Sequence, residues 1–316
     1  MSILNYLYSA FGYVLEFFYK LFGSNYVLAI VLFTVVVRLL LLPTSIPQQK
    51  NQAKQFRIQP KMQKLQEKFG RDRQRLQQEQ QDLYSREGFN PMAAGCGPML
   101  VTLPLLWGVY GAITRPLSCV LHIGTKNLEI LKQAGEKVIS GLGKRQSVLF
   151  ELPLVNEIGK IKDSALALGM DTNVMNAIEK FADSFQLFGM SLCSTPSIKR
   201  FDLLWLIPIL SGVTSLLTSL YSTMVQKKIN PVAAKANAMS TGCMMAFMPL
   251  FSVYICFTLP AGVGFYWVCS NIMSLVQTML LSNLYSPPKV AAKNMILDTI
   301  NRYAREKNIK ENTKVK

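Results

Sequence analysis

Residues 26–46 read YVLAIVLFTVVVRLLLLPTSI, an apolar run with one charged residue, Arg38, near its middle. A helix rises about 1.5 Å per residue, so roughly 20 residues cross the hydrocarbon core of a bilayer. A charge at that depth costs between about 2.5 and more than 10 kcal/mol, depending on the reference state. The stretches that we predict to span the membrane contain no Asp or Glu. Arg38 is therefore expected to face water inside the membrane, or a partner supplied by another molecule.

The composition is typical of a polytopic membrane protein. Of the 316 residues, 50% are hydrophobic and 16% are charged, and nearly all the charge lies outside the apolar runs. We therefore predict an all-α polytopic membrane protein. The formal net charge of +16 indicates an anionic partner, which is nucleic acid, anionic lipid or ribosomal RNA.

Five apolar runs predict five transmembrane helices. They are residues 26–46, 92–114, 203–223, 241–259 and 260–285, in chain order. Pro260 separates the last two, which predicts a tight hairpin within the membrane. The long segment between the second and third spans, residues 115–202, carries amphipathic patterns, including a helix over 173–188 that follows an Asp171-Thr172 cap.

The N-terminal segment, residues 1–25, is aromatic and apolar with a narrow polar face. Asn5, Ser9, Glu16 and Lys20 fall within about 60° of one another on a helical wheel. This pattern favours an amphipathic helix that lies in the membrane interface. A signal peptide and a sixth span are the alternatives, and the lack of Lys or Arg at the start speaks against the first.

Residues 47–91 are basic and rich in Gln, with ten Lys and Arg against five Asp and Glu. Two helical patterns, residues 48–69 and 72–86, are separated by Gly70, and Pro60 is expected to interrupt or kink the first. We interpret this segment as a helical hairpin that projects from the membrane. The alternative is a solvated basic loop that only orients the protein.

The distribution of charge predicts the topology, because cytoplasmic loops carry an excess of Lys and Arg. The hairpin has a net charge of +5 (10 − 5), the loop at residues 224–240 has +3, and the tail at residues 286–316 has +5 (8 − 3). Five spans put all three on one side, which we assign to the cytoplasm, with the N-terminus outside. The low hydrophobicity of the tail predicts a partly disordered cationic arm.

Polar side chains recur on single faces of the predicted spans. The third span carries Ser211, Ser215, Thr218 and Ser222, and the fifth carries Trp267, Asn271, Ser274 and Thr278, flanked by Ser270 and Gln277. Thr34 lies one turn before Arg38. Ser and Thr also join helices in membranes without any further role. Asn271, Gln277 and the unpaired Arg38 favour a hydrated groove that several helices line.

The sequence resembles the YidC/Oxa family of membrane protein insertases. The resemblance is carried by TVVVRLLLLP at residues 34–43, Pro60-Lys61, Gly70 with Asp72, Leu83-Tyr84, Asn90-Pro91, Gly95-Cys96, Pro98, Pro104, and residues 244–277 with MPLF and LPAGVGFYWVCSNIMSLVQ. It covers all five spans and the hairpin.

The resemblance implies a groove that is open to the cytoplasm and to lipid and that receives the hydrophilic part of a nascent membrane protein. It implies that Arg38 is the groove arginine and that Thr34 and Trp267 contact substrate. Thr102 departs from the family, where many members have Gln before the Leu-Pro pair, which puts one groove hydrogen bond in doubt. The outer segment of residues 115–202 is longer than the resemblance leads us to expect.

No feature of the sequence indicates an enzyme, a metal site or a cofactor. The six cysteines form no C-x-x-C pair, there is no Gly-rich phosphate loop, and His122 is the single histidine. Cys119 and Cys193 bracket the outer segment, and spacing alone leaves a disulfide between them open.

The alternative function is a transporter or channel for a small anion, with Arg38 as the binding charge. Internal repeats are common in transporters, and none is evident here. The expected partners of an insertase are nascent membrane proteins, the lipid bilayer and, through the basic tail, the ribosome, while participation of a Sec translocon is left open. The lack of a transit peptide rich in Arg and Ser favours a bacterial plasma membrane.

Overall fold

The computed structural model describes residues 3–89, 97–139, 142, 150–229 and 238–314. The chain divides into two compact units, each of which is described by itself. The first unit is Met1–Leu40, Val101–Tyr221 and Met239–Leu275, and the second is Leu41–Leu100, Ser222–Ala238 and Val276–Lys316. Several long helices therefore begin in one unit and end in the other.

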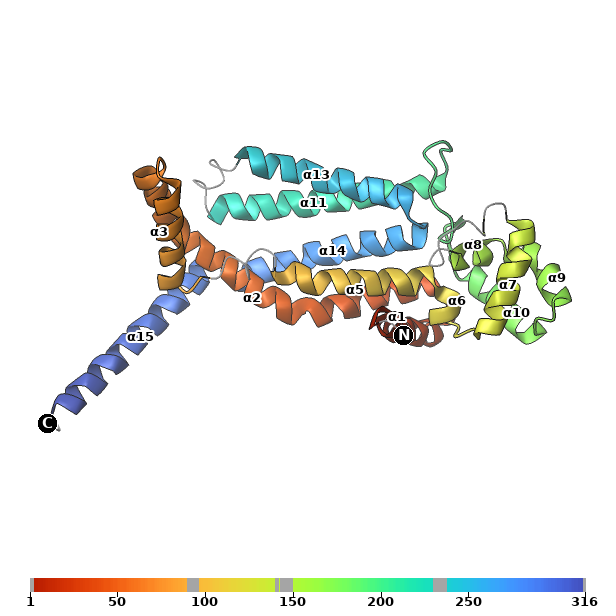
Figure 1. The fold of residues 1–316 in the computed structure, drawn as a ribbon, viewed down its shortest axis with the longest axis horizontal. Helices are drawn as coiled ribbons and strands as arrows, with labels where there is room; N and C mark the ends of the chain where they lie inside the picture. Colours follow the sequence, from red (N-terminus) through yellow and green to blue (C-terminus); the bar gives the residue numbers. More distant parts are fainter. Residues whose placement is uncertain (1–2, 90–96, 140–141, 143–149, 230–237, 315–316) are drawn as a thin grey trace. The chain divides into compact units, whose positions relative to one another are not determined.

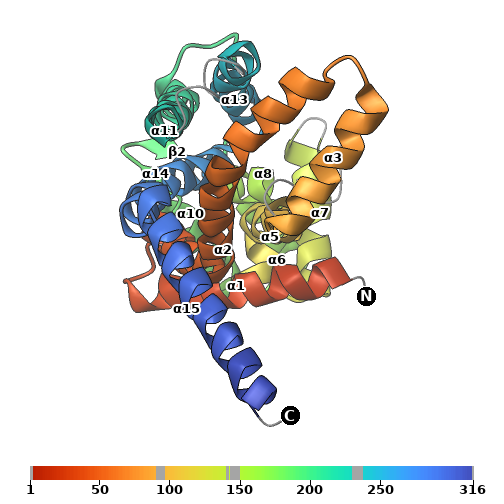
Figure 2. The same ribbon diagram turned by 90° about the vertical axis from the view of Figure 1, so that its left-hand side faces the viewer.

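The long helices are shown in Figure 1. They are α1 (Ile3–Leu21), α2 (Tyr26–Phe69), α5 (Gly97–Thr114), α11 (Leu206–Ile229), α13 (Ala238–Thr258), α14 (Ala261–Leu284) and α15 (Pro287–Lys314). Within the first unit, α1 lies across the ends of the helices that run along the bundle (Figures 1 and 2).

Three helical segments in the described part of the chain are long and apolar enough to cross a membrane. They are Tyr26–Pro47, Leu203–Val225 and Ala261–Leu284. Two shorter apolar helices, Leu103–Thr114 and Ala246–Thr258, correspond to the other two predicted spans. The protein is therefore a mostly helical membrane protein, and the count of five spans stays a prediction.

The outer segment folds into a small helical domain within the first unit. Its elements are α6 (Pro116–Cys119), α7 (Thr125–Val138), α8 (Glu151–Asn156), α9 (Ile158–Ala167), α10 (Thr172–Asp183), β1 (Gln186–Leu187) and β2 (Met190–Ser191). The 3-10 turn η2 (Leu203–Trp205) follows the segment and leads into α11. The apolar face of α10 buries Met175, Ile178 and Phe181 in its core.

The helix predicted over 173–188 begins at the expected cap but ends early. The side chain of Asp171 accepts a hydrogen bond from the N–H of Asn173 at 2.9 Å, which stabilises the start of α10. The prediction was wrong at the other end, because α10 stops at Asp183. Beyond it, β1 and β2 pair as an antiparallel hairpin whose turn is Phe188-Gly189, and both turn residues have positive φ. A helix cannot continue through that conformation.

Aromatic packing joins the outer domain to the start of the first predicted span. Tyr26 is fully buried, and its ring lies 5.1 Å from that of Phe181 and 4.3 Å from that of Phe185. Aromatic pairs at such distances add about 0.5–1.5 kcal/mol to the free energy of burial. The outer domain and α2 therefore share one hydrophobic core.

One buried carboxyl group links α8 to α6. Glu151 is 1% exposed and accepts hydrogen bonds from the backbone N–H of Ser118 at 3.0 Å and from its hydroxyl at 2.5 Å. Burial raises the pKa of Glu151 above its ordinary value, and the bonds from Ser118 work in the opposite direction. The carboxyl group is therefore a structural link between two short helices.

Both cysteines that bracket the outer segment are thiols. Cys119 and Cys193 are buried and free. Burial raises the pKa of Cys119 to about 12, and it raises the pKa of Cys193 as well. Such thiols are chemically inert, as is usual for buried structural cysteines.

In the second unit, α2 runs on into the first arm of the basic hairpin without a break. It contains Pro43, Pro47 and Pro60, so Pro60 does not interrupt the arm, and the alternative of a kink at Pro60 stays a prediction. The helix ends at Phe69, directly before the predicted break at Gly70. The second arm, α3 (Arg73–Arg86), starts at Asp72, whose carboxylate accepts a bond from the N–H of Arg75 at 3.1 Å.

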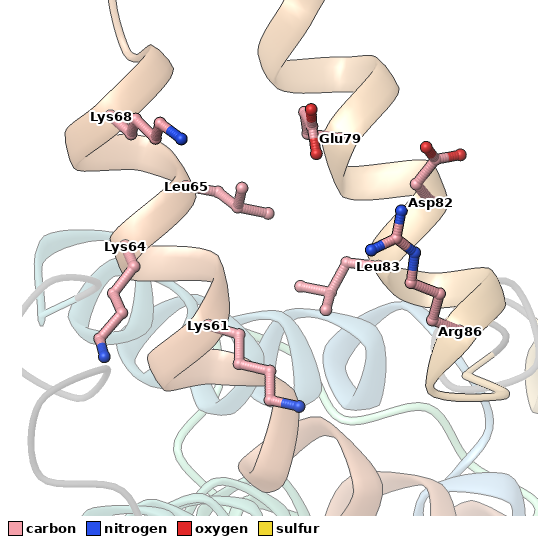
Figure 3. A pocket seen from close by; sticks show the side chains of 8 residues that line it. All are labelled: Lys61, Lys64, Leu65, Lys68, Glu79, Asp82, Leu83 and Arg86. Atoms are coloured by element: carbon pink, nitrogen blue, oxygen red, sulfur yellow. The ribbon is translucent and has the colours of Figure 1, made fainter.

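An open pocket of about 250 Å³ lies between the two arms (Figure 3). Leu65 and Leu83 point toward one another across it. The charged residues around them are Lys61, Lys64, Lys68, Glu79, Asp82 and Arg86. An ion pair between Lys61 and Glu87 joins the arms near their base.

Two predicted loops are helical where the structure describes them. The helix of the third predicted span, α11, continues past residue 223 to Ile229, so the start of the predicted loop at residues 224–240 is helical. The tail was expected to be partly disordered, and this was wrong, because α15 is a helix from Pro287 to Lys314. After Pro288 the tail contains no Gly or Pro, and Ala, Lys, Leu, Arg and Glu favour helix.

Glycine residues allow α1 to approach the bundle closely. A methyl group on Gly12 would lie 2.2 Å from the backbone oxygen of Cys119 in α6. On the same side, Gly108 and Gly111 of α5 lie against Leu7, Phe11 and Tyr8. Without a hydrophobic drive between helices in lipid, such close backbone contact is a main source of association.

We predict that Gly12→Ala loosens the contact between α1 and α6. The backbone of Cys119 cannot move aside as a flexible side chain would, so overpacking should cost about 1–3 kcal/mol. In a variant with Cys119 as its single cysteine, alkylation by a maleimide should become about 5- to 150-fold faster. Gly159→Ala in α9 is the matched control, since no atom lies within 4 Å of its added methyl group. Equal rates in the two variants would contradict the prediction.

Candidate functional site

The charged residue of the first predicted span lies against the last one. The Nη2 atom of Arg38 in α2 donates hydrogen bonds to the backbone oxygen of Ser270 at 2.7 Å and to its hydroxyl oxygen at 2.5 Å. Both residues are half-buried and both belong to the first unit. These bonds connect α2 to α14 at the position of Arg38, the one charged residue of the first predicted span.

Arg38 keeps its uncompensated charge in this arrangement. Within the described ranges, no carboxylate lies within ion-pair distance of its guanidinium group. The sequence indicated no partner within the chain, and the structure supplies a neutral one, the hydroxyl and carbonyl of Ser270. Neutral acceptors reduce the cost of burying the cation but do not cancel its charge. The positive charge therefore remains available to an anionic group.

A second polar contact joins α11 to α14 at Asn271, the residue after Ser270. The Asn271 side chain donates to the hydroxyl of Thr214 at 3.4 Å, and the hydroxyl of Thr218 donates to the backbone oxygen of Asn271 at 3.5 Å. Both distances are long, so these bonds are weak. Ser215, from the same predicted polar face, is buried, with 9% of its surface exposed.

Trp267 contacts α13. Its indole N–H donates to the hydroxyl of Ser252 at 3.2 Å, and Ser252 is buried. Trp267 and Arg38 therefore have different partners, although both lie on or against α14.

The other predicted groove residues have varied surroundings. Thr34 is buried and donates its hydroxyl to the backbone oxygen of Ile30 in its own helix, at 2.7 Å. Ser274 is half-buried in α14. Gln277 belongs to the second unit, and its side-chain oxygen is buried with no hydrogen-bond partner in the described part of the chain. Thr102 lies in α5, and its side chain is outside the described residues.

Three polar residues of this region were missing from the predicted site, namely Ser270, Ser252 and Thr214. Ser270 was noted beside the polar face of the fifth predicted span but was not named as a groove residue. Ser252 and Thr214 had no signal in the sequence, because isolated Ser and Thr are common in membrane helices.

Comparison with known proteins assigns the chain to a family of membrane proteins. A family model described as 60Kd inner membrane protein matches residues 17–288. The chain belongs to this family. It is the YidC/Oxa family that the sequence resembles, so the resemblance is confirmed.

Relatives in this YidC/Oxa family match most of the chain. Membrane protein insertase YidC 2 of Listeria innocua is 28% identical over 283 residues, which are 88% of this chain and 71% of the relative. Membrane protein insertase MisCA of Bacillus subtilis is 26% identical over 266 residues, 83% of this chain and 72% of the relative. Membrane protein insertase YidC of Nitratidesulfovibrio vulgaris is 28% identical over 264 residues, 84% of this chain but 36% of the relative.

We predict that water reaches the polar contacts between α11 and α14. Asn271→Cys and Ser215→Cys should react with a membrane-impermeant maleimide added from the cytoplasmic side, and Ser215→Cys should react more slowly because its site is more buried. Leu216→Cys is the matched control, since Leu216 is exposed on the neighbouring face of α11, where lipid should prevent the reaction. Lys227→Cys is the positive control for access. If positions 215 and 271 stay unlabelled while position 227 reacts, the contacts are dry.

Proposed function

We infer that this chain is a membrane protein insertase and chaperone of the YidC/Oxa family. The family model covers residues 17–288, and curated insertases match 83–88% of the chain. The chemistry of one residue supports the same function: Arg38 is a cation in an apolar helix, its partner is neutral, and its charge can attract an acidic group of another protein. The relatives are insertases, so the chain is not an enzyme.

Arg38 receives the hydrophilic part of a nascent membrane protein in this proposal. Attraction between opposite charges strengthens as the dielectric falls, so a carboxylate that enters the membrane is drawn toward the guanidinium group. Arg38, Ser270, Asn271, Ser215 and Trp267 line the receiving groove, with Thr34, Thr102 and Ser274 as the remaining candidates of the first unit. Gln277, in the second unit, stays a prediction from the sequence. The weak bonds of Asn271 support this role, because a polar segment can replace them at small cost.

The hydrophobic part of the substrate leaves the groove for lipid. Burial of an apolar side chain contributes about 1.5–3 kcal/mol, so a transmembrane segment partitions into the bilayer without an energy source. Nascent membrane proteins and the lipid bilayer are thus the partners of the insertase.

The membrane topology completes the proposal. Five helices cross a bacterial plasma membrane, with the N-terminus outside and the hairpin and tail in the cytoplasm. The positive-inside rule supports this orientation, since the net charges of the three cytoplasmic segments are all positive. α1 lies in the outer interface, which its exposed aromatic residues Tyr6, Tyr13 and Phe17 support.

The first test concerns the charge of Arg38. Arg38→Ala should reduce insertion of a single-span protein with an acidic translocated tail by about tenfold or more, which corresponds to a loss of about 1.4 kcal/mol. Arg38→Lys should retain much of the activity, because the charge is retained. Insertion is measured in a strain depleted of its own insertase.

Ser270→Ala is the matched control for this test. It removes the hydroxyl acceptor of Arg38 but leaves the backbone oxygen and the charge. We expect insertion close to that of the parent. Full activity of Arg38→Ala would refute the role of the charge. If Ser270→Ala and Arg38→Ala were equally impaired, the contact between α2 and α14 would be the requirement instead.

The second test concerns α15. An insertase must reach translating ribosomes, and we propose that the tail binds ribosomal RNA through its eight basic residues. Truncation after Ser286 should weaken co-sedimentation with ribosomes in detergent, most strongly at low salt. Replacement of Lys289, Lys293 and Lys307 by Gln keeps the helix and should reproduce part of the loss.

The competing partner of α15 is anionic lipid. Ile296, Ile300 and Tyr303 are exposed and follow the spacing of one helical face, which a membrane surface would also accept. If the truncated and full-length proteins bind ribosomes equally across a salt series, the tail is a lipid anchor or an orientation signal.

A further inference from the structure

The tip of the β1–β2 hairpin carries a phenylalanine in an unfavourable position. Phe188 has φ +51° and Gly189 has φ +78°, so the two residues form a hairpin turn with both φ values positive. Asn, Asp and Gly are the usual residues in such turns, and a bulky residue there is an outlier. The side chain of Phe188 is also 82% exposed, so it does not pack into the protein core. Neither the turn nor the protein core explains a phenyl ring at this place.

Backbone hydrogen bonds fix the hairpin to the start of a predicted span. The N–H of Gly262 donates to the backbone oxygen of Leu192 at 2.7 Å, and the N–H of Ala261 donates to that of Ser194 at 2.8 Å. Ala261 is the first residue of the apolar segment Ala261–Leu284. The hairpin is therefore held at the level where α14 enters the membrane.

A second apolar projection lies just before another predicted span. Ile198 is 72% exposed and Phe201 is 81% exposed, and the apolar segment Leu203–Val225 begins two residues after Phe201. This loop is well anchored. The indole N–H of Trp205 is within 3.0 Å of the backbone oxygens of both Ser197 and Arg200.

Aromatic contacts extend the anchor to a third helix. The ring of Trp205 lies 4.9 Å from that of Phe201 and 4.9 Å from that of Phe257, near the end of α13. Trp side chains such as Trp205 are enriched at the interface between hydrocarbon and headgroups. The loop thus holds Ile198 and Phe201 in place at the ends of α11 and α13.

We propose that Phe188, Ile198 and Phe201 form an apolar rim that inserts into the headgroup region of the bilayer. Both projections are tied to the first residues of apolar spans, so they are continuous with the surface that faces lipid. Lys199 and Arg200 are exposed beside the rim and complement lipid phosphates, with their aliphatic stems along the apolar layer. The exposed phenyl ring and its unusual turn are then explained by burial in lipid, and the rim fixes the outer domain against the membrane surface.

The rim is tested with nitroxide labels in reconstituted vesicles. Single cysteines at Phe188 and Phe201 are labelled in a variant without other cysteines. Leu168, at the end of α9, is the matched control, since it is also an exposed apolar residue of the outer domain. Collision of each label with oxygen, which concentrates in lipid, is compared with collision with a water-soluble nickel complex. Phosphatidylcholine vesicles with and without phosphatidylglycerol are used.

We expect the oxygen-to-nickel ratio at positions 188 and 201 to be severalfold higher than at position 168. A further rise with phosphatidylglycerol would support the role of Lys199 and Arg200, and an equal ratio in both vesicles would support apolar insertion alone. A ratio at position 188 equal to that at 168 overturns the proposal. A change at position 188 only while a nascent membrane protein is being inserted also overturns it, because the partner of the rim would then be a protein.

Discussion

The placement of one guanidinium group in an apolar layer is the constraint on which the bundle depends. Arg38 has five N–H donors, and its bonds to Ser270 occupy only the Nη2 nitrogen. A second buried charge from the chain would neutralise Arg38, whereas a serine positions the group and leaves its field intact. An incoming carboxylate therefore finds a cation that is already oriented, and the bond to the backbone oxygen of α14 can persist while substrate is bound.

Sequence patterns predicted those features that depend on one segment at a time. Apolar runs located the helices of the bundle, and Asp72 and Asp171 marked two helix starts. Sequence patterns could not predict the features that depend on how two helices are aligned against each other. Ser270 was not chosen because no pattern shows which face of α14 meets Arg38. The hydroxyl of Thr34 bonds to its own helix, and its place in the groove stays a prediction. The early end of α10 was missed because Phe188 is a rare residue for a turn with positive φ.

Two different physical regimes stabilise the first unit. The outer domain is held by a hydrophobic core, in which Met175, Ile178 and Phe181 are withdrawn from water. Between membrane helices that drive is absent, and close contact at Gly108 and Gly111 of α5 replaces it. The aromatic cluster of Tyr26, Phe181 and Phe185 lies where the two regimes meet. Substitutions with equal loss of volume should therefore be more damaging in the outer domain than on the faces of α11 and α13 that contact lipid.

The buried thiols of the outer domain have a consequence for its chemical lifetime. Burial raises the pKa of Cys119 to about 12, so its thiol stays protonated at pH 7, whereas the thiolate is the form that oxidants attack. Residues 115–202 are placed by our proposal on the outer side of the membrane, where reducing systems of the cytoplasm are absent. Burial of Cys119 and Cys193 thus slows their oxidation. The domain can therefore persist in an oxidising environment without forming disulfides to neighbouring proteins.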